Sequence, residues 1–143
     1  MDLSEFPMPK EAFVVTQFLS IKDAIVSAKY YAHVFEGKVL HEGHPFFVKL
    51  SNTWLILNEG GGPTIDKPDY YLEAPTPESR TFLNIRVADI QRCYRDWQDR
   101  GAEFLTPPQD MEAEWRTYIK DPDSYIIGVG QATTNMPESI SNN

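Results

Sequence analysis

The stretch that decides the fold is Thr117-Tyr118-Ile119-Lys120-Asp121-Pro122-Asp123-Ser124-Tyr125-Ile126-Ile127-Gly128-Val129, close to the C-terminal end of the chain. Two runs that are rich in β-branched and aromatic residues flank the polar tetrapeptide 121–124. Pro122 has the fixed φ that suits the second position of a turn, and the Asp121 side chain can bond the backbone two residues on. The stretch therefore predicts a β-hairpin with a type I turn.

The composition excludes several classes of protein. The chain has 143 residues, a formal net charge of -8 and 41% hydrophobic residues, which is typical of a globular domain and argues against a nucleic-acid partner. It has no apolar run of about 18 residues, no signal-peptide pattern at its N-terminus, and one cysteine, Cys93. We therefore expect a cytoplasmic protein with no membrane segment and no disulfide. The negative charge slightly favours neutral or cationic ligands, although solubility alone also explains it.

The pattern predicts the same order of elements twice. Asp23 and Asp89 are good N-caps for two helices, and Gly37 and Gly101 end these helices, Gly37 as a left-handed cap. Each helix follows one strand and precedes three, so each half is a βαβββ module. The expected strands cover residues 13–21, 38–42, 45–50, 53–58, 81–87 and 102–105, together with the two strands of the closing hairpin, which ends near Gln131.

The domain organisation follows from the segments between these elements. Residues 1–12 read as an irregular arm, and residues 13–131 as one domain with modules over 13–59 and 80–131. The linker 60–79 is long and polar, and a loop of this length is usually functional or joins modules. The polar tail 132–143 is expected to be disordered.

Several of these segments together resemble the vicinal-oxygen-chelate superfamily, which includes glyoxalase I, extradiol dioxygenases and the bleomycin and fosfomycin resistance proteins. Residues 23–31 are similar to the first-helix pattern Asp-x-x-x-Ser-x-x-Phe/Tyr-Tyr, and residues 87–90 and 100–103 are similar to the start of the second module and its helix end. The turn 121–124 is similar to Asp-Pro-Asp-Gly, with Ser124 in place of the glycine. The resemblance covers roughly residues 13–131. It implies an α+β fold in which two βαβββ modules form a curved eight-stranded mixed sheet around a cavity, and it implies a homodimer.

The metal-ligand positions of the superfamily can be read onto this chain. In metal-dependent members, each module's first strand supplies a ligand seven residues before the helix-capping Asp, and the modules' last strands supply the others. These positions hold Thr16, Phe82, Gly128 and, for the fourth glyoxalase ligand, Ile56. None of them offers an imidazole, carboxylate or thiolate, so we expect no metal ion and no cofactor.

Two other groups could carry chemistry. His41-x-x-His44, with Glu36 and Glu42 close in sequence, could form a displaced metal site, although solvated surface histidines are the simpler interpretation. Cys93 lies on an apolar helix face without a basic neighbour, which favours an inert thiol over a nucleophile.

Strand alternation predicts which side chains face the cavity. The expected set is mostly aromatic and apolar with a few polar groups, which is typical of a small-molecule pocket. Aromatic planes suit a flat conjugated ligand or a cation; alternatively, the rings fill the concavity as core. The expected ligand-binding residues are Thr16, Phe18, Phe47, Trp54, Ile56, Asn58, Phe82, Asn84, Arg86, Arg116, Tyr118 and Gly128.

Two main hypotheses of function follow. The first is a metal-free binding protein, similar to the bleomycin resistance type, that sequesters an aromatic or polycyclic toxic metabolite or antibiotic. The second is an enzyme of the same superfamily, a lyase, transferase or dioxygenase, with a displaced metal site or with metal-free acid–base chemistry. Arg116, Tyr118 and Glu59 are the candidates for that chemistry. A third and simpler possibility is a domain that binds a metabolite of its host.

Overall fold

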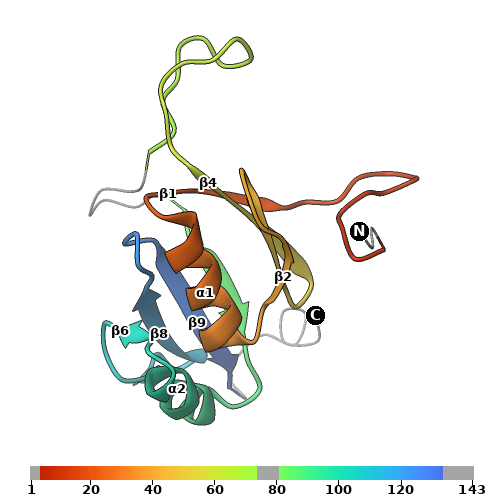
Figure 1. The fold of residues 1–143 in the computed structure, drawn as a ribbon. Helices are drawn as coiled ribbons and strands as arrows, with labels where there is room; N and C mark the ends of the chain where they lie inside the picture. The colour runs from red at the N-terminus through yellow and green to blue at the C-terminus, as the bar shows by residue number, and fades with distance from the viewer. Residues whose placement is uncertain (1–3, 74–80, 134–143) are drawn as a thin grey trace. The chain divides into compact units, whose positions relative to one another are not determined.

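Residues 4–73 and 81–133 are described by the structure, a computed structural model (Figure 1). The chain divides into two compact units, residues 1–75 and residues 76–143. The end of the expected linker, 74–79, and residues 134–143 of the expected tail lie outside the described residues. None of the helices in the described ranges is long and apolar enough to cross a membrane.

The first unit is a βαβββ module. It contains, in chain order, β1 (Gln17–Ile21), α1 (Ala24–Phe35), β2 (Lys38–His41), β3 (Phe46–Leu50) and β4 (Thr53–Glu59). The strand order in its sheet is β1-β4-β3-β2, and β1 runs parallel to β4. Helix α1 packs on β2, β3 and β4. The side chains buried on the helix side of the sheet are Leu19, Ile21, Val48, Leu55 and Leu57. We call the opposite side of this sheet the first open face.

The ends of α1 show one correct and one wrong prediction. Asp23 caps the N-terminus, because its Oδ1 accepts from the backbone N–H groups of Ile25 at 3.0 Å and Val26 at 3.2 Å. The left-handed residue at the C-terminus is Glu36, with φ 58°, and not Gly37. Gly37 is closely packed, because a Cβ there would lie 3.0 Å from both the Tyr31 carbonyl oxygen and Val48 Cγ1.

The second unit repeats this arrangement with one additional short strand. It contains β5 (Leu83–Arg86), α2 (Ile90–Asp99), β6 (Glu103–Phe104), β7 (Gln109–Asp110), β8 (Glu114–Lys120) and β9 (Ile126–Ala132). The strand order is β5-β9-β8-β6, β5 runs parallel to β9, and the unpredicted β7 also pairs with β8. Asp89 caps α2 and Gly101 follows it with φ 105°, as expected.

Helix α2 packs against part of one side of the second sheet. It contacts β6 and β9, and the backbone N–H of Ile90 donates to Gln131 Oε1 at 2.7 Å. The side chains buried on this side are Thr117, Ile119, Ile127 and Val129. We call the opposite side of this sheet the second open face. It carries the alternate residues of β5, β8 and β9.

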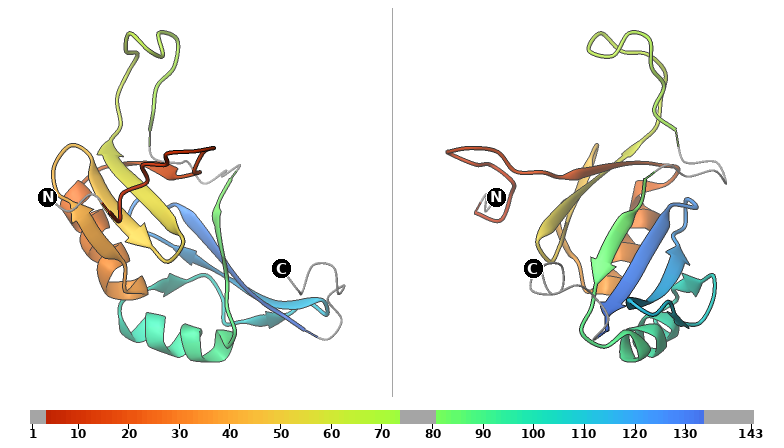
Figure 2. Two further views of the ribbon diagram at one scale, coloured as in Figure 1. Left: turned by 90° about the vertical axis from the view of Figure 1, so that its right-hand side faces the viewer. Right: turned by 180° about the vertical axis from the view of Figure 1, so that it is seen from behind.

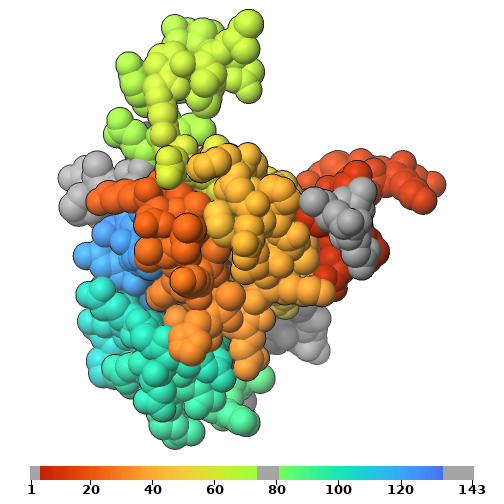
Figure 3. Space-filling view, viewed as in Figure 1, coloured from red at the N-terminus to blue at the C-terminus, as the bar shows by residue number. Residues whose placement is uncertain are grey.

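The two irregular segments of the first unit differ from the expectation. The predicted strand over 13–21 begins only at Gln17, and Phe13 and Val15 before it are exposed, because the pairing of β1 with β4 starts at Gln17. Residues 60–73 pair with each other through the bridges Gly61–Leu72 and Thr64–Lys67. They form an extension that runs away from β4, drawn yellow-green in Figures 1 and 2, and it stands out from the orange and yellow body of its unit in Figure 3.

The β8–β9 hairpin has the predicted turn. The backbone N–H of Ser124 donates to the Asp121 carbonyl at 3.0 Å, which closes a β-turn. The buried Asp121 carboxylate accepts from the backbone N–H groups of Asp123 at 2.9 Å and Tyr125 at 2.8 Å. Ser124 has φ 72°, the left-handed conformation of the residue that follows such a turn in a hairpin.

The predicted fold class is confirmed. The protein is α+β, with two helices and mixed sheets among the described residues, and the hydrogen bonds group the strands into one sheet of four and one of five.

The left-handed Ser124 gives a prediction for stability. Ser124→Gly should raise the free energy of unfolding by about 0.5–1 kcal/mol, because glycine adopts a positive φ without steric cost. This net gain already includes the larger entropy that glycine loses on folding. Ser124→Ala is the matched control and should give no such gain, since its Cβ remains. Urea unfolding of both variants measures the difference, and an equal stability of the glycine and alanine variants would contradict the explanation.

Candidate functional site

The first open face carries a row of three apolar side chains across three strands. Phe18 on β1 lies opposite Ile56 on β4, and Ile56 lies opposite Phe47 on β3. In the next position along β1 and β4, Ser20 lies opposite Asn58. Phe18 is 41% exposed although it sits on a sheet. Phe18, Ile56 and Phe47 therefore share one face of this sheet, and Thr16 lies one residue before β1.

The N-terminal arm covers part of the first open face, which the sequence did not predict. The Trp54 indole Nε1–H donates to the Glu5 carbonyl at 2.6 Å, and the Phe6 ring lies 5.5 Å from the Phe47 ring. Lys49 Nζ lies 5.6 Å from the Trp54 ring centroid. Trp54 is therefore half-buried and anchored, with less free surface for a ligand than its position on the strand implied. The arm has no periodic pattern, so no signal in the sequence assigned it to this surface.

The second open face carries an aromatic pair over a glycine. Asn84, Gly128 and Tyr118 lie side by side on β5, β9 and β8. The Phe82 ring lies 5.7 Å from the Tyr118 ring in an edge-on arrangement and is 50% exposed. A Cβ on Gly128 would lie 2.9 Å from Phe82 Cε2 and 3.4 Å from Tyr118 Cε1. The missing side chain at Gly128 thus gives the Phe82 ring its place on the sheet.

The next row on the same face is ionic. Arg86, Gly130 and Arg116 lie side by side on β5, β9 and β8. Glu114 bridges the two arginines, with its Oε2 at 2.8 Å from Arg86 Nη1 and its Oε1 at 3.1 Å from Arg116 Nε. Glu114 was not among the predicted site residues. The alternation of β8 places it on the face of Arg116, but its pairing with Arg86 depends on the strand register.

The twelve predicted site residues divide between the units. Phe18, Phe47, Trp54, Ile56 and Asn58 lie on strands of the first unit, and Thr16 lies one residue before β1. Phe82, Asn84, Arg86, Arg116, Tyr118 and Gly128 share the second open face.

The positions of the superfamily metal ligands do not fit a metal ion. Thr16, Phe82, Gly128 and Ile56 supply no strong donor, and the Phe82 ring occupies the space above Gly128. Within residues 4–73 and 81–133, no group of three or more His, Cys, Asp or Glu side chains could hold a metal ion.

The alternative His41 and His44 site has a different arrangement. His41 Nδ1 lies 3.0 Å from the Pro45 carbonyl oxygen, which accepts a hydrogen bond from it, and the ring meets the Phe47 ring edge-on. His44 lines a pocket of about 360 Å³ with Asp23, Glu42 and Glu59. Asp23 already serves as the α1 cap, so its carboxylate is engaged.

Cys93 does not have the surroundings of a nucleophile. Its thiol is half-buried on α2, and its pKa is raised, first by burial and then by the negative charges of Asp89 and Asp96. The thiol therefore stays protonated at neutral pH.

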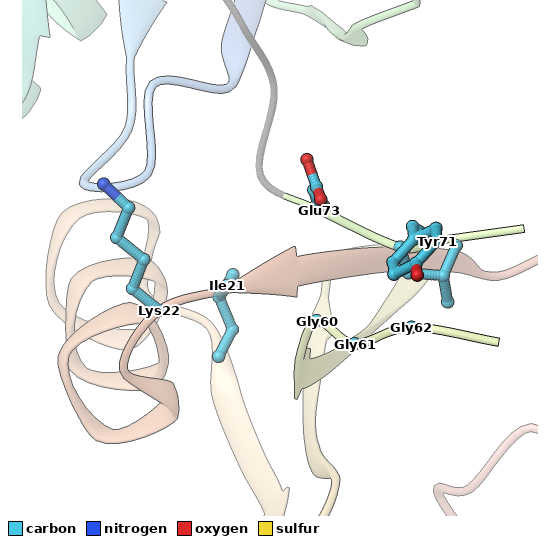
Figure 4. A pocket seen from close by; sticks show the side chains of 8 residues that line it. Ile21, Lys22, Gly60, Gly61, Gly62, Tyr71 and Glu73 are labelled. Carbon is cyan, nitrogen blue, oxygen red and sulfur yellow. The ribbon is translucent and has the colours of Figure 1, made fainter. Parts of the chain in front are cut away.

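A second pocket lies at the root of the extension 60–73, and the sequence did not predict it (Figure 4). Its volume is about 490 Å³, and it is lined by Ile21, Lys22, Gly60, Gly61, Gly62, Tyr71, Leu72 and Glu73. The glycines allow the two sides of the extension to approach, because a Cβ on Gly62 would lie 2.8 Å from Tyr71 Cε1.

Comparisons with known proteins agree on the fold. A family model described as Glyoxalase/Bleomycin resistance protein/Dioxygenase superfamily matches residues 14–129. The fosfomycin resistance protein FosX of Mesorhizobium loti has a TM-score of 0.61 and 14% identity, over 89% of this chain and 96% of that one. A lactoylglutathione lyase of Agrobacterium tumefaciens has a TM-score of 0.64 and 14% identity, over 86% and 96%. An integron cassette protein of V. cholerae has a TM-score of 0.65 and 16% identity, over 88% and 99%.

The contact between Phe82 and Gly128 can be tested by a double-mutant cycle. Gly128→Ala should lower the free energy of unfolding by about 1 kcal/mol, because the new methyl group displaces the Phe82 ring. In a Phe82→Ala background, the same substitution should be neutral or stabilising, since alanine suits a strand better than glycine. Thermal unfolding of the four proteins gives the coupling, and the same cost in both backgrounds would show that the ring does not lie over Gly128.

Proposed function

The chain belongs to the Glyoxalase/Bleomycin resistance protein/Dioxygenase superfamily, and from this premise we propose that it is a metal-free binding protein for an aromatic or polycyclic small molecule. One observation carries the proposal. The second open face presents the Phe82 ring over Gly128 at positions where metal-dependent members have ligands. These two positions offer an aromatic plane and edge, and neither supplies a donor for a divalent ion.

The exposure of the rings supports binding. Phe82 is 50% exposed and Phe18 is 41% exposed, each on a sheet surface whose other side is a packed core. Neighbouring polar groups such as Asn84 and Asn58 can orient a ligand. A mostly apolar surface with a few polar groups is the usual composition of a small-molecule site.

The role we propose is sequestration of a toxic metabolite or antibiotic in the cytoplasm. The fosfomycin resistance protein of Mesorhizobium loti is similar in structure to this chain, and the superfamily includes bleomycin resistance proteins. The single cysteine fits a reducing compartment. A protein that sequesters its ligand binds it unchanged and needs no catalytic group. The competing hypothesis, an enzyme, requires that the ligand is converted to a product.

The proposal predicts binding of a neutral fused-ring probe, 2-naphthamide, at the second open face. Phe82→Ala should weaken this binding by about 1–3 kcal/mol, the range for loss of an aromatic contact. Tyr70→Ala is the control, because Tyr70 is an aromatic side chain that is 71% exposed on the extension of the first unit; it should bind like the wild type. Isothermal titration calorimetry measures all three proteins.

The same titration tests the absence of a metal requirement. Protein dialysed against a chelator should bind 2-naphthamide with unchanged affinity, and the probe should be recovered unaltered. Elemental analysis of the untreated protein that found about one transition-metal ion per chain, or loss of binding after chelation, would overturn the metal-free proposal.

We also propose a homodimer. Strands β1 and β2 are the two edge strands of the first sheet, and each pairs with one neighbour in that sheet. The extension 60–73 also exposes Ile65, Tyr70 and Tyr71. A closed two-fold pair can cover strand edges and apolar side chains. Light scattering at micromolar concentration should give twice the mass of the chain, and the mass of a single chain would contradict it.

A further inference from the structure

The ionic row of the second open face contains more positive than negative charge. Two guanidinium groups, of Arg86 and Arg116, share the single carboxylate of Glu114, which leaves a net charge of +1. This surplus occurs in a chain whose formal net charge is -8. Within the described residues, both arginines pair with Glu114. One carboxylate cannot accept hydrogen bonds from all the N–H groups of two guanidinium groups.

Both arginines can be reached from solvent. The Arg86 side chain is 45% exposed and the Arg116 side chain 40%, while Glu114 between them is only 18% exposed. The Arg116 Nε itself is buried and makes no hydrogen bond in the described part of the chain, because its 3.1 Å approach to Glu114 lacks hydrogen-bond geometry. The remaining N–H groups of these two partly exposed side chains, and not the buried Arg116 Nε, are therefore the donors that a second anion can use.

Gly130 leaves space on β9 for the guanidinium group of Arg86. A Cβ on Gly130 would overlap Arg86 Nη1 and would lie 2.8 Å from Arg86 Cζ. The guanidinium group thus lies over β9, where its ion pair with Glu114 holds it. A planar donor group held at a surface loses less conformational entropy on binding than a free side chain, which favours recognition of a planar carboxylate.

The aromatic pair lies in the neighbouring row. Phe82 and Tyr118 meet around Gly128, two residues along β9 from Gly130. Two residues along a strand span about 7 Å. A fused aromatic ring on Phe82 and Tyr118 can therefore present a substituent to the two arginines.

We propose that Arg86 and Arg116 form an anion subsite that binds the carboxylate of an aromatic acid whose ring lies on Phe82 and Tyr118. The net charge of +1 matches a monoanion and is too small for a phosphate dianion. This inference rests on the proposed function and specifies its ligand: an aromatic acid, in contrast to the neutral or cationic ligand that the overall charge favoured.

The test compares 2-naphthoate with its neutral analogue 2-naphthamide. Wild-type protein should bind the acid about tenfold more tightly than the amide, as charge-assisted hydrogen bonds from arginine provide. Arg116→Met and Arg86→Met should each reduce this preference to near unity while the amide affinity changes less than about twofold. Arg92→Met is the matched control, because Arg92 forms an exposed ion pair with Asp96 on α2, and it should keep the preference.

Glu114→Gln separates an anion subsite from a purely structural ion cluster. Removal of the shared negative charge should strengthen 2-naphthoate binding severalfold and leave the amide unchanged. A structural cluster would instead lower the unfolding temperature without changing the ratio of the two affinities. Equal affinities of wild type for acid and amide, or an unchanged ratio in the arginine variants, would overturn this inference alone. Failure of both probes to bind at millimolar concentration would overturn the proposed function with it.

Discussion

The missing side chains of Gly128 and Gly130 are the constraint on which the binding surface depends. Both glycines lie on β9, the strand between β5 and β8, so side chains from both neighbours can lie across it. Phe82 occupies the space over Gly128, and Arg86 the space over Gly130. Each glycine in a strand costs roughly 0.5–1 kcal/mol relative to alanine. The two glycines thus lower the stability of β9, and they leave the space in which Phe82 and Arg86 lie on one face of the sheet.

Local signals in the sequence predicted most of the fold. Asp23 and Asp89 cap the helices, and Asp121 holds the turn, because each bonds backbone groups within a few residues. The left-handed position at the end of α1 was assigned wrongly to Gly37, because glycine is the usual residue there, and the structure places Glu36 in that conformation. Strand propensity also extended β1 too far, because residues 13–16 are β-branched or aromatic in part but have no partner strand.

The alternation of side chains along each strand indicates which residues share a face of the sheet. The pairing of β5, β9 and β8 determines which of those residues lie next to each other. Alternation alone placed Phe82, Arg116 and Tyr118 on the second open face. The bridge from Glu114 to Arg86 required knowledge that β5 pairs in parallel with β9, and β9 with β8. The contact of Glu5 with Trp54 joins residues 49 positions apart through a segment without a repeating pattern, so no sequence rule could assign it.

The parallel pairing of β5 with β9 has a consequence for the order of folding. Strands β8 and β9 are joined by the short turn at Asp121, so their hairpin closes locally and at little entropic cost. Strand β5 precedes β9 by about 40 residues in the chain, and such non-local contacts form slowly. We expect β5 to dock last in its unit, on a hairpin that already exists. Folding would then expose the two bare glycines of β9 before Phe82 and Arg86 cover them, so the ligand-binding surface is completed in the final step.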